Sequence, residues 1–91
     1  MISIKDKKII FKSIPRYFQK EESGLKPNTV RIVDHSEYHA ILNMFKDGEL
    51  EEILIHKSAS EDHFCRKLTD ISYVGSIAGK ELVVFSWKHE D

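Results

Sequence analysis

Three side chains that can bind an anion or a polarised carbonyl follow one another closely in the first third of the chain. Lys26, Thr29 and Arg31 lie in residues 24–31, whose sequence is GLKPNTVR. Arginine offers a planar fork of donors for phosphate or carboxylate, and lysine offers a mobile point charge. No carboxylate occurs within this run. The residue types therefore predict a binding site for a phosphate, a carboxylate or a carbonyl group.

The spacing of these residues fits a β-strand over residues 29–33. Side chains alternate between the two faces of a strand, so Thr29 and Arg31 point the same way. Val30 and Ile32 then point the other way, and we expect them to face apolar surroundings. On this interpretation a hydroxyl and a guanidinium group lie side by side on one face of the strand.

The same residues could also perform acyl transfer. A threonine hydroxyl becomes a nucleophile only when a nearby base takes its proton. A lysine serves as that base where burial or an adjacent positive charge lowers its pKa from about 10.4. Arg31 could supply the adjacent charge, while Pro27 restricts Lys26 to extended backbone geometry. A solvated strand face with no ligand is the third interpretation of the pattern.

The run resembles the ASCH domains of the PUA-like superfamily, which are small β-barrels with a Gly-x-Lys-x-x-Glu-x-Arg signature between a first helix and a strand. Gly24, Lys26 and Arg31 match this signature, and Thr29 stands in place of the glutamate. Within the superfamily, the small bacterial N4-acetylcytidine amidohydrolases carry Lys-x-x-Thr-x-Arg, which this chain also matches. Small phage-encoded proteins of this type are similar as well, in residues 23–31 and in the terminal run 83–87.

This resemblance implies a set of roles. In an amidohydrolase, Thr29 would be the nucleophile, Lys26 its activating base and Arg31 a supporting residue. Glu81 and Asp70 are the two candidates for the distal catalytic carboxylate, and neither occupies a position that matches the family motif. In a binding domain, Lys26, Thr29 and Arg31 would line a ligand pocket, with the hydroxyl of Tyr17 at its mouth.

Charge is distributed unevenly along the chain, although 14 Lys and Arg against 15 Asp and Glu give a net charge of −1. The chain therefore lacks the bulk positive field of a nonspecific nucleic-acid binder. Its first 26 residues are nevertheless basic, and its middle is acidic. We expect this polarity to steer RNA or DNA toward the motif. The basic residues are Lys5, Lys7, Lys8, Lys12, Arg16, Lys20 and Lys26, and the acidic ones are Asp47, Glu49, Glu51, Glu52, Glu61 and Asp62.

Composition limits the remaining possibilities. Cys65 is the only cysteine, which excludes an internal disulfide and a cysteine-based zinc cluster and favours a reduced, cytoplasmic setting. His35 and His39 have the spacing of two metal ligands on a helix, but no third ligand shares their face cleanly, so we expect no metal. We also expect no cofactor, no membrane-spanning segment and no signal peptide.

Helix signals occur twice in the first half of the chain. Ser13 followed by Pro15 predicts a helix over residues 14–23 with Ser13 as its N-cap and Gly24 as its left-handed end. Glu21 falls at the edge of the apolar stripe of this helix. Asp34 and Glu37 have capping-box spacing before a second helix, predicted over residues 35–47.

The second half of the chain has the shorter period of β-structure. Strands are predicted over residues 50–57, 64–69, 71–74 and 80–88, in addition to residues 8–12 and 29–33. The segment 58–62 is the expected hairpin loop, and Gly75 and Gly79 are expected to bracket a turn. We therefore predict one domain over residues 1–91 with an α+β fold. Its finer form, implied by the resemblance, is a small PUA-like (ASCH) β-barrel of five or six mostly antiparallel strands with two helices.

Three functions follow as hypotheses. The first is a binding module for RNA, a nucleotide or a modified base in a pocket lined by Lys26, Thr29 and Arg31. The second is an amidohydrolase of the N4-acetylcytidine type. The third is a phage or mobile-element protein that binds a host protein through its acidic middle segment or an exposed apolar patch.

Overall fold

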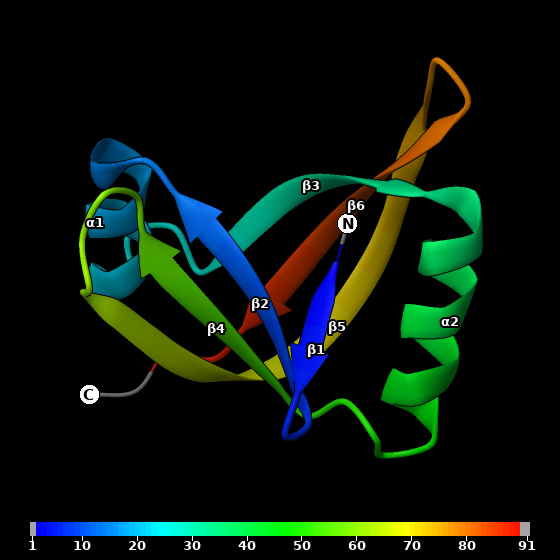
Figure 1. Ribbon diagram of the computed structural model, residues 1–91, viewed down its shortest axis with the longest axis horizontal. Helices are drawn as coiled ribbons and strands as arrows, with labels where there is room; N and C mark the ends of the chain where they lie inside the picture. Colours follow the sequence, from blue (N-terminus) through cyan, green and yellow to red (C-terminus); the bar gives the residue numbers. More distant parts are fainter. Residues whose placement is uncertain (1, 90–91) are drawn as a thin grey trace.

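Two helices and a six-stranded sheet make up the computed structural model, which describes residues 2–89 (Figure 1). The strand order in the sheet is β1-β2-β4-β5-β6-β3. Only β2 and β4 are parallel, and every other neighbouring pair is antiparallel. The elements in chain order are β1 (Ser3–Lys5), β2 (Lys8–Ser13), α1 (Pro15–Ser23), β3 (Asn28–Asp34), α2 (His35–Lys46), β4 (Glu52–Lys57), β5 (His63–Ile77) and β6 (Lys80–Trp87).

The α+β class, the two helices and the mostly antiparallel sheet are confirmed, but the sheet is not closed into a barrel. Its two outer strands, β1 and β3, are not hydrogen-bonded to each other. The described part of β1 pairs only with Lys8 to Ile10 of β2. Just before β1, the Ile2 amide donates to Glu37 Oε2 of α2 at 3.0 Å. Within residues 2–89, β1 therefore does not pair with the last residues of β2, 11–13.

Strand β5 joins the two halves of the sheet. Its first residues pair with β4, and its remaining residues pair with β6. The strands predicted over 64–69 and 71–74 are therefore one strand of 15 residues. Gly75 does not open a turn but lies inside β5 beside a register shift, and the reversal to β6 occurs at Ala78 and Gly79. The predicted loop over residues 58–62 is confirmed between β4 and β5.

Helix α1 begins at Pro15, one residue later than predicted. Its N-cap residue is Ile14, and Pro15 occupies the first turn, where a missing N–H costs nothing. Ser13 belongs to β2, so the predicted N-cap role of Ser13 is wrong. The helix ends as predicted at Gly24, whose φ of 89° is left-handed. A Cβ at this position would also lie 2.8 Å from the imidazole of His89, so glycine is required for two reasons.

Helix α2 is confirmed within one residue at its C-terminal end. The capping box between Asp34 and Glu37 is present, and the helix ends before Gly48, whose φ is 77°. Ile41 is the residue that this helix buries most completely. Figure 1 shows α1 and α2 at opposite sides of the molecule, with β3 running between them. No helix within residues 2–89 is long and apolar enough to cross a membrane.

The orientation predicted for β3 is reversed. Thr29 and Val33 are 3% and 2% exposed, whereas Val30 and Ile32 are 49% and 56% exposed. The core lies on the inner face of the bent sheet, where Phe11 of β2 contacts Phe85 of β6 with ring centroids 5.0 Å apart. Thr29 and Arg31 do share a face, as predicted, but it is the inner one. The functional side chains consequently point toward β2 and α1 instead of into open solvent.

Candidate functional site

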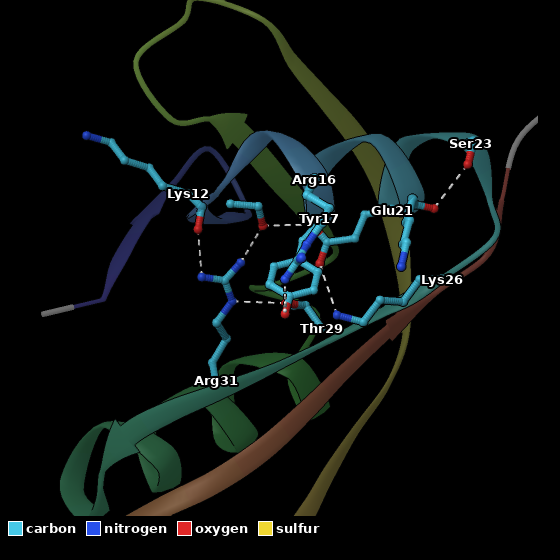
Figure 2. A network of polar contacts seen from close by, with 10 residues as sticks. Lys12, Arg16, Tyr17, Glu21, Ser23, Lys26, Thr29 and Arg31 are labelled. Atoms are coloured by element: carbon cyan, nitrogen blue, oxygen red, sulfur yellow. Dashed lines mark hydrogen bonds and ion pairs between the residues drawn. The ribbon is translucent and has the colours of Figure 1, made fainter.

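A cavity of about 290 Å³ lies between α1, the end of β2 and the start of β3 (Figure 2). All four residues predicted to bind a ligand, Tyr17, Lys26, Thr29 and Arg31, line it. They come from three consecutive parts of the chain, which are α1, the turn after it, and β3. The cavity is also lined by Lys12, Ser13, Ile14, Glu21 and Val30.

The turn after α1 brings Lys26 back toward the helix. Gly24 takes the left-handed conformation that ends the helix, and the Lys26 amide donates to the carbonyl oxygen of Lys20 at 3.0 Å. Pro27 then starts the extended segment, and its carbonyl oxygen accepts a hydrogen bond from the Trp87 amide at 3.1 Å. This geometry directs the Lys26 side chain toward Glu21 and Thr29 (Figure 2).

Arg31 connects β3 with the last residues of β2, 11–13, which do not pair with the described part of β1. Its Nη1 donates to the Lys12 carbonyl oxygen and its Nη2 to Ser13 Oγ, both at 2.8 Å. Its guanidinium carbon lies 4.7 Å from the centroid of the Phe11 ring. Burial lowers the pKa of Arg31, and the carboxylate of Glu21 partly offsets this effect. Arg31 therefore supplies, through its side chain, a link that backbone pairing does not make here.

Thr29 is bound to the same guanidinium group. Arg31 Nε donates to Thr29 Oγ1 at 3.0 Å, so the threonine oxygen acts as an acceptor and its own hydroxyl hydrogen is left to donate. Three of the five N–H groups of Arg31 are thus used inside the protein. Only the other two N–H groups of Arg31 are left to donate to a ligand in the cavity.

Two residues of the site, Glu21 and Ser13, were not predicted to belong to it. Glu21 is 1% exposed, and its Oε1 accepts a hydrogen bond from Ser13 Oγ at 2.7 Å. Its Oε2 lies 3.8 Å from Lys26 Nζ, which forms an ion pair. The available signal was helix periodicity, because Glu21 lies three residues after the buried Phe18 on the face that α1 turns inward.

Tyr17 stands at the mouth of the cavity, with 41% of its surface exposed. The guanidinium carbon of Arg16 and the Nζ atom of Lys26 each lie 5.1 Å from the centroid of its ring. Arg16 Nη2 also donates to the phenol oxygen at 3.2 Å, and this hydrogen bond lowers the pKa of Tyr17. The ring is therefore a partly exposed aromatic surface in a positive environment.

The predicted distal carboxylates lie outside the cavity. Glu81 is at the start of β6, where its Oε1 is 3.2 Å from His35 Nδ1. Asp70 accepts a hydrogen bond from Ser72 on β5. The rings of His35 and His39 are 4.5 Å apart, but residues 2–89 contain no cluster of three side chains suited to a metal ion.

The basic first third of the chain does not form one surface. Lys7 and Lys8 form ion pairs with Glu51 and Glu52 at 3.9 and 3.8 Å, beside the start of β2. Lys12 and Lys26 line the cavity near the other end of β2, and Arg16 contacts Tyr17. The acidic residues of the middle segment are likewise divided, because residues 47–51 precede β4, Glu52 begins it, and residues 61–62 follow it.

Comparisons of the chain with protein-family models, with curated proteins and with solved structures gave no match.

Proposed function

We propose that this chain is a small ASCH-like binding module that holds a nucleotide, or a single base or modified base of RNA, in the cavity beside α1. One observation carries the proposal: Tyr17, Lys26, Thr29 and Arg31 converge on one cavity together with a buried carboxylate, Glu21. Its volume of about 290 Å³ is at the lower end of the range for small-molecule sites. The cavity therefore suits a single base or nucleoside better than a duplex.

The chemistry of the lining supports recognition of a base. Sequence-specific RNA binding depends on unstacked bases that lie against aromatic rings and are hydrogen-bonded along their edges. Tyr17 supplies a partly exposed ring at the mouth, and Thr29 supplies a hydroxyl donor inside. Lys26 supplies a positive charge between them, at 5.1 Å from the centroid of the Tyr17 ring.

Two contacts favour binding over turnover. Arg31 Nε donates a hydrogen bond to Thr29 Oγ1, which draws electron density away from the oxygen that would have to attack. Lys26 forms an ion pair with Glu21, whereas lysines become bases in apolar pockets or beside another cation. In this site Thr29 acts as a hydrogen-bond donor to the ligand, and Lys26 acts as a charge.

Hydrolysis of an N4-acetylcytidine-type amide is the second candidate function. The observation in its favour is that Lys26 and Thr29, which match the amidohydrolase motif, share one cavity with a carboxylate. In that reaction Thr29 Oγ1 would attack the acyl carbonyl carbon while a neutral Lys26 takes the hydroxyl proton. The bond from the acyl carbon to N4 would break as Lys26 returns this proton to the departing amine, and water would then release acetate from the acyl-threonine. Glu21, in place of Glu81 or Asp70, would be the carboxylate of the site.

Calorimetric titration with nucleosides and short single-stranded RNA tests the binding proposal. We expect Thr29→Val to weaken the affinity about fivefold, because one neutral hydrogen bond contributes about 1 kcal/mol. Lys26→Met is expected to weaken it about tenfold or more. The matched controls are Thr69→Val and Lys46→Met, which alter exposed residues outside the cavity. Absence of binding of any nucleoside or RNA to the folded wild-type protein would reject the proposal.

An assay for release of acetate from N4-acetylcytidine separates the two functions. The binding module is expected to leave the substrate intact over many hours. Sustained deacetylation by the wild-type protein that disappears in Thr29→Val would instead establish the amidohydrolase. In that case Lys26→Met should be nearly as inactive, because residues that act as one catalytic unit lose activity together.

A further inference from the structure

Glu21 is a buried carboxylate whose two oxygens have different partners. Its Oε1 accepts the hydrogen bond from Ser13, but its Oε2 is 3.8 Å from Lys26 Nζ, beyond hydrogen-bond distance. Within residues 2–89 no side chain or backbone group donates a hydrogen bond to Oε2. Burial of a charged group is costly unless its hydrogen-bonding capacity is used. Since Glu21 borders the cavity, a ligand that enters it can donate a hydrogen bond to Oε2 in place of water.

The direction of the neighbouring hydrogen bonds fixes Glu21 as an acceptor. Arg31 Nη2 donates to Ser13 Oγ at 2.8 Å, and the Ser13 hydroxyl in turn donates to Glu21 Oε1 at 2.7 Å. Ser13 therefore has no hydrogen left for a ligand. The polar groups that remain in the cavity are an acceptor on Glu21, donors on Thr29 and Lys26, the two unused N–H groups of Arg31, and the Tyr17 hydroxyl at its mouth.

The charges in the cavity restrict the ligand further. A phosphate or carboxylate placed deep in the cavity would meet the negative charge of Glu21. A cationic amine would meet Lys26 and Arg31 instead. A neutral group that both donates and accepts hydrogen bonds avoids both costs. On their Watson–Crick edges, cytosine and adenine offer an exocyclic amino donor next to a ring nitrogen acceptor, and glutamate accepts readily from such an amino group.

We propose that Glu21 makes this cavity selective for a nucleobase edge with an exocyclic amino group, over inorganic phosphate and over the corresponding oxo base. The proposal rests on the proposed function, because it concerns the ligand of the same cavity. Glu21 accepts the amino hydrogen through Oε2. Thr29 and Lys26 donate to the acceptors of the base.

Two pairs of matched ligands test this selectivity, because cytidine and uridine, and likewise adenosine and inosine, differ in an amino or an oxo group. Binding of each nucleoside is measured by calorimetry with the wild-type protein and with Glu21→Gln. The wild-type protein is expected to prefer the amino member of each pair by about tenfold, equivalent to about 1.4 kcal/mol. Glu21→Gln is expected to abolish or invert this preference, because Ser13 donates to the amide oxygen of glutamine and the amide NH2, a donor, then faces the base.

Glu22→Gln is the matched control, since Glu22 is the exposed neighbour of Glu21 and lies outside this cavity. It should keep the wild-type ratio, and inorganic phosphate should not displace bound cytidine from the wild-type protein. If Glu21→Gln does not fold, Ser13→Ala is the second variant. It removes the hydrogen bond that orients Glu21 Oε1 and should also lower the ratio.

The possible failures are distinguishable. Equal affinity of the wild-type protein for both members of each pair, or a ratio unchanged in Glu21→Gln, overturns the role of Glu21 while the binding function stands. Displacement of cytidine by phosphate likewise overturns the selectivity. A folded wild-type protein that binds none of the four nucleosides rejects the proposed function itself, and the selectivity with it.

Discussion

Replacement of Arg31 by methionine should destabilise the fold strongly, although the residue lies in a surface cavity. Its guanidinium group bonds Thr29, Lys12 and Ser13 and lies over Phe11, so it joins β3 to the end of β2 that β1 leaves uncovered. Methionine retains part of the apolar contact with Phe11 but makes none of these hydrogen bonds. The two strands then lose their polar connection at this point.

The size of the effect follows from the contacts. Two part-buried hydrogen bonds to hydroxyl groups contribute about 1 kcal/mol each, and the exposed one to the Lys12 carbonyl contributes less. Loss of the cation–π contact with Phe11 adds about 0.5 kcal/mol. The sum is about 3 kcal/mol, against a total of roughly 5 to 14 kcal/mol expected for a domain of this size. Arg31→Met should therefore fold, with a Tm lower by about 12 to 24 °C.

Urea unfolding at constant temperature, followed by circular dichroism, measures the loss directly. Arg16→Met is the matched control, because Arg16 is exposed and, within residues 2–89, its guanidinium group donates a hydrogen bond only to its neighbour Tyr17. The control should change the free energy of unfolding by less than about 0.5 kcal/mol. An Arg31→Met protein as stable as the control would refute the view that Arg31 links the two strands. Arg31→Lys should be intermediate, since one ammonium group cannot reach three separated acceptors.

Three further predictions concern the fold. Gly24→Ala should lower the free energy of unfolding by about 1 to 2 kcal/mol, because alanine is strained at positive φ; urea unfolding that matches wild type would contradict this. Val33→Thr should lower the free energy of unfolding by about 1 to 3 kcal/mol because it buries a hydroxyl, whereas Ile32→Thr, on the exposed face, should lower it by under about 0.5 kcal/mol. Equal losses in urea unfolding would disprove the assigned faces of β3. The hydrogen bond from Lys80 lowers the pKa of Asp34 in the folded protein. The ionised Asp34 side chain therefore stabilises the fold at pH values above its unfolded-state pKa, and this stabilisation disappears as the pH falls through the folded-state pKa. Asp34→Asn should accordingly flatten the acid side of the stability profile, and an unchanged profile of unfolding midpoints against pH would exclude this contribution.

The helices could be predicted from the sequence because their signals are local. The capping box of Asp34 and Glu37 and the left-handed end at Gly24 each depend on residues within one helical turn. The grouping of Thr29 and Arg31 on one strand face was also predictable, because alternation is a property of the extended backbone.

Which face of β3 points inward could not be read from the strand itself. Apolar residues occur on both faces, with Val30 and Ile32 on one and Val33 on the other. The choice depends on the bend of the sheet, which brings β2 and β6 together through Phe11 and other core residues. The role of Arg31 was hidden for a similar reason, since its partners on β2 are 18 and 19 residues away in the sequence.

Glu21 shows where the prediction of the site itself fell short. Helix periodicity placed it at the edge of the apolar stripe, but burial of a carboxylate there requires partners that periodicity does not identify. Those partners are Ser13, from the strand before the helix, and Lys26, from the turn after it. A charged residue at an inward position of an amphipathic helix is thus a useful signal of a polar cavity.

The central claim is that the cavity beside α1 binds a nucleobase. The most direct test is a titration of the isotope-labelled protein with cytidine, in which the chemical shifts of the backbone amides are followed by NMR. We predict saturable shifts concentrated at Ser13, Tyr17, Glu21 and Thr29, with little change in α2 and in the far end of the β5–β6 hairpin. Saturable shifts confined to those distant elements, or no shifts at millimolar cytidine, would contradict the claim.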